Sequence, residues 1–155
     1  MRGRCDCGEI TYELAEAPLF VHCCHCRWCQ RETGSAFAMN AIIEADRFSV
    51  LSGSPEVIDT PTQSGRGQKI ARCPTCKVAL WSTYASPVFH FVRVGTLEDP
   101  DACPPSIHIF TESKQPWVVL PEGAPAVPQY YDLREHWPAE SQARRKACKE
   151  RITRS

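Results

Sequence analysis

Cysteine is the residue type whose number and spacing in this sequence point most directly to chemistry. Ten cysteines occur among 155 residues, and seven of them lie in three short runs: Cys5-Asp6-Cys7, Cys24 to Cys29, and Cys73-Pro74-Thr75-Cys76. Thiols this close in sequence pair poorly with each other as disulfides, whereas short loops of this kind hold two sulfurs about one tetrahedral edge apart. The spacing therefore predicts zinc binding and disfavours a disulfide framework.

The first and last runs predict one shared, closed zinc site. Each run offers two thiolates, and a structural zinc ion takes four ligands, usually in a tetrahedron. Since neither pair fills such a shell alone, the two pairs are expected to share one ion across 65 intervening residues. Metal affinity then becomes folding free energy, on the order of 10 kcal/mol for a small structural site. The predicted ligands of this site are Cys5, Cys7, Cys73 and Cys76.

The middle run predicts a second site that stays open. Cys24, Cys26 and Cys29 can converge on one ion from a single tight loop, and three protein ligands with one free position are typical of catalytic zinc. The alternative is that a fourth protein ligand closes the shell and makes the site structural. The candidates for that ligand are His22, Cys23, His25 and Cys103.

Three thiolates would suit this second site to a soft substrate. Zinc with three thiolates carries a formal negative charge, so it is a weaker Lewis acid than zinc on three histidines and better suited to holding a substrate thiolate. This favours carbon–sulfur bond formation or cleavage over hydrolysis. Basic residues beside the cysteines could bind substrate carboxylates, or could simply be solvated surface charge; they are Arg27, Arg31, Arg72 and Lys77.

Short strands are expected to position these residues. Ile10, Tyr12 and Leu14 alternate with polar residues, the period-two pattern of a half-buried strand. Runs separated by glycine- and proline-rich turns predict further strands at Ala36–Ile43, Arg47–Leu51, Glu56–Thr60, Gln68–Arg72, Val78–Tyr84, Val88–Val94 and Ser106–Phe110. This pattern predicts an all-β fold of antiparallel sheets. Helix is expected only in a turn or two after Cys26, ending near Gly34, and in a C-terminal segment from about Pro138 to Ile152.

Length and composition predict one soluble domain with a charged tail. Apolar residues make up 43% of the chain and charged residues 23%, the balance of a globular protein. The formal net charge is zero, but the segment from Ala139 onward has six basic and two acidic residues, or +4. We therefore expect a zinc-binding domain over residues 1–137, a basic tail over residues 138–155, and no nucleic-acid binding by the main body. No apolar run is long enough to cross a membrane and no secretory signal is evident, so a cytoplasmic protein is expected.

These cysteine motifs occur in the order of a known family. Together with His108-Ile109-Phe110, and with Ser113, Pro116 and Trp117, they resemble the glutathione-dependent formaldehyde-activating enzyme family, whose domain is shared with centromere protein V. The likeness runs from about Arg4 to Leu120. It departs from the family pattern at Lys77, where a glycine usually stands, and at Cys23, which makes an unusual double cysteine.

The resemblance implies a fold, two zinc ions and a reaction. The fold is an all-β arrangement of the β-tent type. The structural zinc would lie on Cys5, Cys7, Cys73 and Cys76, and the catalytic zinc on Cys24, Cys26 and Cys29. The implied reaction joins glutathione and formaldehyde into S-hydroxymethylglutathione, which is a carbon–sulfur lyase step read in reverse.

Single histidines and cysteines outside the three runs have less certain roles. His108 should point to the opposite sheet face from Ile107 and Ile109, and its place in the shared motif makes it a candidate substrate contact or acid–base group. A hydrogen-bonded structural histidine is the alternative. His90 is expected in the core, and the two cysteines without a nearby partner are expected to be free thiols; these are Cys103 and Cys148.

The sequence thus predicts a zinc-dependent carbon–sulfur lyase-type enzyme acting on a small thiol adduct such as S-hydroxymethylglutathione. Its expected cofactor is zinc, with two ions per chain, and its expected partner is a small thiol, with glutathione as a candidate. The alternative is a binding module in which both zinc ions are structural and the basic tail contacts an acidic partner.

Overall fold

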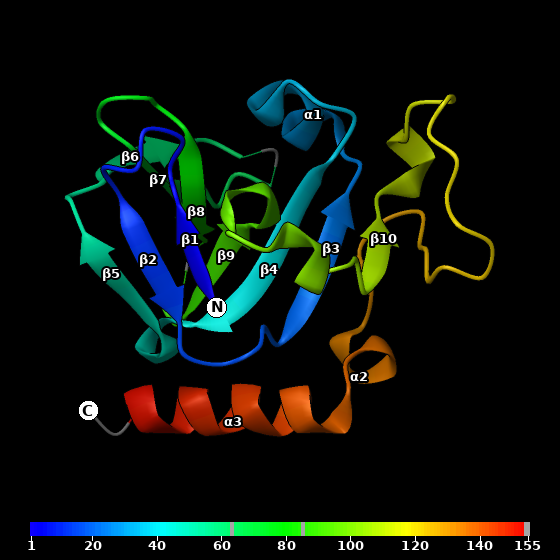
Figure 1. Cartoon of the computed structure of the whole chain (residues 1–155). Helices are drawn as coiled ribbons and strands as arrows, with labels where there is room; N and C mark the ends of the chain where they lie inside the picture. The colour runs from blue at the N-terminus through cyan, green and yellow to red at the C-terminus, as the bar shows by residue number, and fades with distance from the viewer. Residues whose placement is uncertain (63, 85, 154–155) are drawn as a thin grey trace.

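The computed structural model describes residues 1–62, 64–84 and 86–153, which form a mostly β structure with a C-terminal helix (Figure 1). A three-stranded sheet has the order β1-β2-β5 and a seven-stranded sheet the order β10-β3-β4-β9-β8-β7-β6. The small sheet consists of β1 (Arg2–Arg4), β2 (Thr11–Leu14) and β5 (Phe48–Ser52). The large sheet consists of β3 (Phe20–Cys24), β4 (Ala38–Glu44), β6 (Glu56–Thr60), β7 (Gln68–Arg72), β8 (Ala79–Thr83), β9 (Phe89–Arg93) and β10 (Ile107–Ile109).

The helices are few and mostly short. The α-helices are α1 (Arg27–Thr33), α2 (Leu133–His136) and α3 (Ala139–Thr153). Single 3-10 turns occur at Ala45–Arg47, Val94–Thr96, Pro100–Ala102 and Thr111–Ser113. None of the helices in the described part of the chain has the length and apolar character that a membrane span needs.

The predicted strands are all present, and the predicted all-β class is confirmed. The bounds of β6 and β7 agree with the prediction to the residue, and the others differ by one or two residues at an end. The sequence did not indicate β1 and β3. The expectation of antiparallel pairing was wrong for one pair, because β10 runs parallel to β3.

The main core lies between the two sheets. Tyr12 is fully buried from β2 and packs its ring against Phe48 of β5 and Trp81 of β8. Its hydroxyl lies 2.6 Å from Thr96 Oγ1, so the one polar atom of this buried ring has a partner. A Cβ atom at Gly3 would lie 2.2 Å from the Tyr12 ring, which explains why β1 has glycine at this position.

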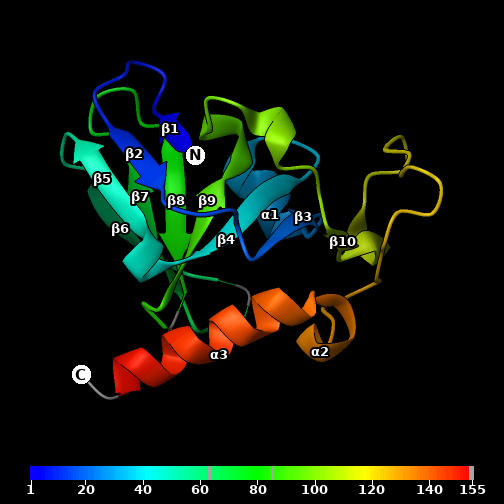
Figure 2. The ribbon, with the colours of Figure 1, turned by 60° about the horizontal axis from the view of Figure 1, so that its bottom comes forward.

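The C-terminal helix α3 lies across one end of the sheets (Figures 1 and 2). Arg144 donates two hydrogen bonds to the carboxylate of Glu44, from Nε at 3.1 Å and from Nη2 at 2.8 Å, and Glu44 is only 1% exposed. Arg151 Nη2 lies 2.6 Å from Asp46 Oδ2. The helix lies within the predicted basic tail, residues 138–155, and these ion pairs join it to the rest of the chain.

Candidate metal centres and the adjoining pocket

The first cysteine group joins the two sheets. Cys5 follows β1 and Cys73 follows β7, and their ligand sulfurs lie within 4.8 Å of those of Cys7 and Cys76. The Sγ atoms of Cys5 and Cys7 are 3.5 Å apart, and those of Cys7 and Cys73 are 3.6 Å apart. Four sulfurs about 2.3 Å from one zinc ion would be about 3.8 Å from each other. The group therefore fits a tetrahedral thiolate site.

Each half of this group is a tight turn that ends in left-handed backbone. The amide of Gly8 donates to the carbonyl of Cys5 at 3.2 Å, and the amide of Lys77 donates to that of Cys73 at 3.0 Å. Gly8 has a φ of 78° and Lys77 a φ of 62°. Lys77 thus adopts the conformation that glycine favours, at a cost of about 1 kcal/mol.

The second cysteine group lies where β3 passes into α1. Cys24 ends the strand, Cys26 is the N-cap residue of the helix, and Cys29 lies in its first turn. The three sulfurs are within 4.8 Å of one another, and no further cysteine, histidine or carboxylate among the described residues belongs to the group. The Sγ atom of Cys26 accepts a hydrogen bond from the Cys29 amide at 3.3 Å. Gly34, with a φ of 66°, ends the helix as predicted.

Contacts between these three sulfurs shift their pKa values in opposite directions. Hydrogen bonds from Cys24 and Cys29 lower the pKa of Cys26. Contacts with Cys24 and Cys26 raise the pKa of Cys29, and contact with Cys26 raises that of Cys24. Binding of a metal ion to the group would release the protons that its thiols hold.

The four residues considered as a fourth ligand are engaged elsewhere. His22 Nε2 lies 2.5 Å from the hydroxyl of Tyr131, and Cys103 lies in the main core, with its sulfur 4.0 Å from that of Met1. Cys23 and His25 belong to a separate group. Among the described residues, the second cysteine group therefore has three candidate ligands.

The third group contains Cys23, His25 and His108, and no pattern in the sequence predicted it. His25 Nε2 lies 3.5 Å from Cys23 Sγ and 3.0 Å from His108 Nδ1. Burial lowers the pKa of His25 to about 4 and also lowers that of His108, so both imidazoles are neutral near pH 7. The predicted catalytic residue His108 is thus grouped with Cys23 and His25, not with the three cysteines of the second group.

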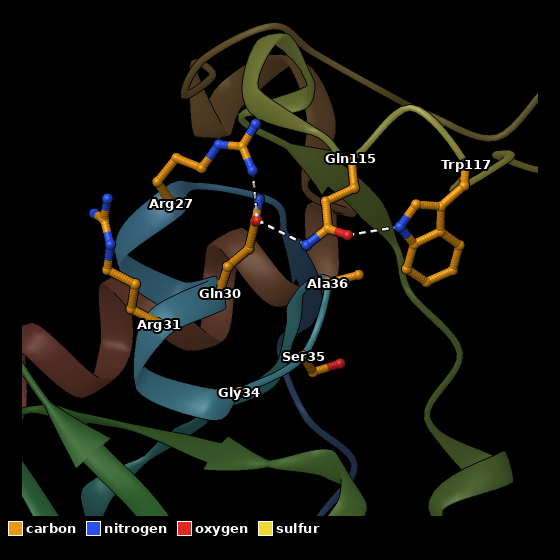
Figure 3. A pocket seen from close by; sticks show the side chains of 8 residues that line it. All are labelled: Arg27, Gln30, Arg31, Gly34, Ser35, Ala36, Gln115 and Trp117. Carbon is orange, nitrogen blue, oxygen red and sulfur yellow. Dashed lines mark hydrogen bonds between the residues drawn. The ribbon is translucent and has the colours of Figure 1, made fainter.

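The helix that contains Cys29 also lines a pocket of about 530 Å³ (Figure 3). Its lining comes mainly from α1 and the residues that follow it, together with two residues after β10. These residues are Arg27, Gln30, Arg31, Gly34, Ser35, Ala36, Gln115 and Trp117. Because Arg27 follows Cys26 and Gln30 follows Cys29, the same short helix contributes to both the thiol group and the pocket.

Hydrogen bonds organise the polar side of this pocket. Gln30 donates from Nε2 to the carbonyls of His25 at 2.7 Å and Ser113 at 3.0 Å, which fixes the direction of its side chain. Its Oε1 accepts from Arg27 Nη1 at 2.9 Å and from Gln115 Nε2 at 3.1 Å. The indole of Trp117 donates to Gln115 at 2.6 Å while the residue stays 70% exposed (Figure 3).

Two of the four basic residues singled out from the sequence line this pocket, and two do not. Arg27 and Arg31 belong to its lining. Arg72 instead pairs with Glu32, and Lys77 Nζ lies 3.3 Å from a carboxylate oxygen of Glu56. The sequence pattern did not indicate Gln30 or Gln115.

These features define a general class, a mostly β protein with cysteine groups that could hold metal ions. The family model described as glutathione-dependent formaldehyde-activating enzyme matches residues 1–113, and the chain belongs to this family. The resemblance found in the sequence is thus confirmed, and the family's description associates it with an enzymatic activity on glutathione and formaldehyde. No curated protein matches the chain. A crystal structure of a Rhodobacter sphaeroides protein, a structural genomics target, shares 23% sequence identity; the match covers 63% of this chain and 88% of that one, with a TM-score of 0.49.

Proposed function

We propose that this chain is a zinc-dependent enzyme that makes or breaks the carbon–sulfur bond of a small thiol adduct, with S-hydroxymethylglutathione as the candidate. The observation that carries this proposal is that one short helix, with its cap, contributes both to the three-cysteine group and to a pocket with two arginines. Membership of the formaldehyde-activating family supports the choice of glutathione and formaldehyde.

The two cysteine groups are proposed to differ in role. The group of Cys5, Cys7, Cys73 and Cys76 supplies four thiolates and connects two sheets, which suits a structural zinc ion. The group of Cys24, Cys26 and Cys29 supplies three, which leaves a position for substrate. When bound there, zinc would supply a soft Lewis acid able to hold a substrate thiolate at neutral pH. None of the ten cysteines forms a disulfide. Reduced thiols are typical of the cytoplasm, the location that we propose for this chain.

The residues around the pocket would bind and orient the remainder of the thiol. Glutathione carries two carboxylates remote from its sulfur, and Arg27 and Arg31 offer guanidinium groups that pair with carboxylates. The side-chain amide of Gln30 already makes four hydrogen bonds, so it would hold Gln115 in place and not bind substrate itself. Gln115 keeps one amide proton and one oxygen lone pair that would position the peptide groups of the substrate. Trp117 would cover an apolar part of the substrate.

The proposed chemistry is balanced without an oxidant or reductant. The thiol sulfur adds to the carbonyl carbon of formaldehyde, the carbon–oxygen π bond opens, and the oxygen takes up the proton that the thiol loses. The reverse reaction releases both molecules. His108 is not among the residues that line the pocket, so its role as a substrate contact or acid–base group remains a prediction.

The test is the exchange rate between free formaldehyde and its glutathione adduct, measured by nuclear magnetic resonance. The zinc-loaded protein should accelerate exchange, and the Cys29→Ser variant should lose the acceleration. Cys103→Ser provides the matched control, because Cys103 is a buried free thiol outside all three groups. Exchange no faster than in a protein-free blank would exclude this substrate pair.

The alternative of a binding module with a basic tail has less support. Arg144 and Arg151 of the tail already pair with Glu44 and Asp46 of the same chain. This internal pairing reduces the positive charge that the tail can offer to an acidic partner.

A further inference from the structure

Three buried side chains, from β3, from the residue that follows it and from β10, bring their ligand atoms close to one another. Side chains alternate between the faces of a strand, so Cys23 faces away from Cys24. Cys24 packs in the second core cluster, whereas Val21, which shares the face of Cys23, packs in the main core. The exposed fractions are 1% for Cys23, 0% for His25 and 7% for His108. This group is therefore separate from the open cysteine group.

We propose that Cys23, His25 and His108 bind a third metal ion, independent of the two cysteine groups. One thiolate and two neutral imidazoles form a donor set for a transition metal ion of borderline or soft character, for which Zn²⁺ and Cu⁺ are the candidates. This site does not depend on the proposed enzymatic function.

The separations of the three ligand atoms leave space for such an ion. Cys23 Sγ is 3.5 Å from His25 Nε2, His25 Nε2 is 3.0 Å from His108 Nδ1, and all three atoms lie within 4.8 Å of one another. In the plane of three atoms so separated, the point equidistant from them lies at most about 2.4 Å from each, against about 2.0–2.1 Å for zinc–nitrogen and 2.3 Å for zinc–sulfur bonds.

Hydrogen bonding alone accounts poorly for this arrangement. His25 Nε2 has either one lone pair or one proton in the plane of its ring, yet both Cys23 Sγ and His108 Nδ1 lie within reach of it. A hydrogen bond can therefore satisfy one contact and not the other. A metal ion accepts a lone pair from each of the three atoms at once. The other ring nitrogen, His25 Nδ1, is buried without a hydrogen-bond partner among the described residues. This holds with or without a metal ion at Nε2, so it does not distinguish a metal site from a hydrogen-bonded group.

The backbone holds the three residues in this geometry. In the parallel pairing of β10 with β3, His108 lies opposite Cys23. The amide of His25 donates to the carbonyl of Ile109 at 3.0 Å. The amide of His108 donates to the carbonyl of Pro125 at 2.8 Å, and its carbonyl accepts from Val127 at 2.9 Å. The ligand atoms are therefore brought together by sheet pairing and not by flexible loops.

The first test is metal stoichiometry in fully reduced, anaerobically loaded protein. With Zn²⁺ we expect three equivalents per chain in the wild type and two in Cys23→Ala, while Cys103→Ala keeps three. A third equivalent obtained with Cu⁺ and not with Zn²⁺ would support the site and identify its metal. Two equivalents in the wild type with both ions would overturn the proposal.

A second test uses the wild-type chain, so it does not depend on a variant that folds. Long-range ¹H–¹⁵N spectra report each imidazole nitrogen separately. Filling the third site should shift the ¹⁵N signals of His25 Nε2 and His108 Nδ1. The signals of His90 should stay unchanged, because His90 packs against Phe48, away from the group. A third equivalent that binds without moving those two signals lies elsewhere and would refute the assignment.

Discussion

Arg31 offers the sharpest test of how the proposed pocket selects its substrate. Arg31→Ala removes a guanidinium from the pocket lining and leaves the cysteines in place. A hydrogen bond to a charged group contributes about 1.5–3 kcal/mol, and solvent screening in an open pocket reduces this to about 1–2 kcal/mol. Since 1.4 kcal/mol corresponds to a factor of ten, KM for glutathione should rise roughly 5- to 30-fold.

The effect should fall on KM and leave kcat nearly unchanged. A carboxylate remote from the reacting sulfur binds Arg31 equally in the ground state and in the transition state, and such uniform binding does not change kcat. The assay is the formaldehyde exchange rate at increasing thiol concentration, with glutathione and with cysteamine, which has no carboxylate. Arg66→Ala, an exposed arginine at a different surface pocket, is the control. An equal rise in KM for both thiols, or no rise in KM for glutathione, would refute carboxylate recognition by Arg31.

Three further predictions concern stability. Cys76→Ser should lower the free energy of unfolding by several kcal/mol, because the four-cysteine group joins two sheets. Cys29→Ser should lower the free energy of unfolding much less. Equal losses of thermal stability in the two variants would contradict the assigned roles. Arg144→Ala should cost about 3 kcal/mol in urea unfolding, because it leaves Glu44 buried without its main partner; adding Glu44→Gln should recover part of this loss. Burial lowers the pKa of His90 to about 4 from 6.5, so the unfolded chain binds the proton more tightly. The stability contributed by neutral His90 is complete above pH 6.5 and falls as the pH drops toward 4, by at most about 1.4 kcal/mol per unit. His90→Leu should therefore flatten the decline in unfolding midpoint between pH 7 and pH 4.5 relative to the wild type, and an unchanged slope would contradict this reasoning.

The sequence predicted eight of the ten strands in the described residues and missed β1 and β3. β2 shows the expected alternation, with Tyr12 and Leu14 buried between partly exposed neighbours. In β3 all five residues are buried, so the period-two signal is absent. The close spacing of Cys24, Cys26 and Cys29 also favoured an interpretation of the end of this segment as part of a metal-binding loop.

Separation along the chain explains which parts of the site could be predicted. The groupings of Cys5 with Cys7, and of Cys24 with Cys26 and Cys29, follow from short spacing along the chain. The contact between His25 and His108 joins residues 83 positions apart, and it depends on the register of a parallel strand pair that no local pattern specifies. Sequence reasoning offered His108 as a candidate substrate contact or acid–base group, or as a hydrogen-bonded structural histidine, but it could not predict the contact of its ring with His25.

The short helix α1 explains why the thiol group and the pocket occur together. Its cap and first turn provide Cys26 and Cys29, and Gln30 and Arg31 follow directly into the pocket. Isolated helices of seven residues are unstable in water, so tertiary contacts must hold this one. Glu32, with its side chain 8% exposed, pairs with Arg72 of β7 and with Arg93 of β9, and so joins the helix to the large sheet. The thiols and the arginines belong to this one helix and its cap, so the helix sets the spacing between them, and the ion pairs of Glu32 hold the helix on the large sheet.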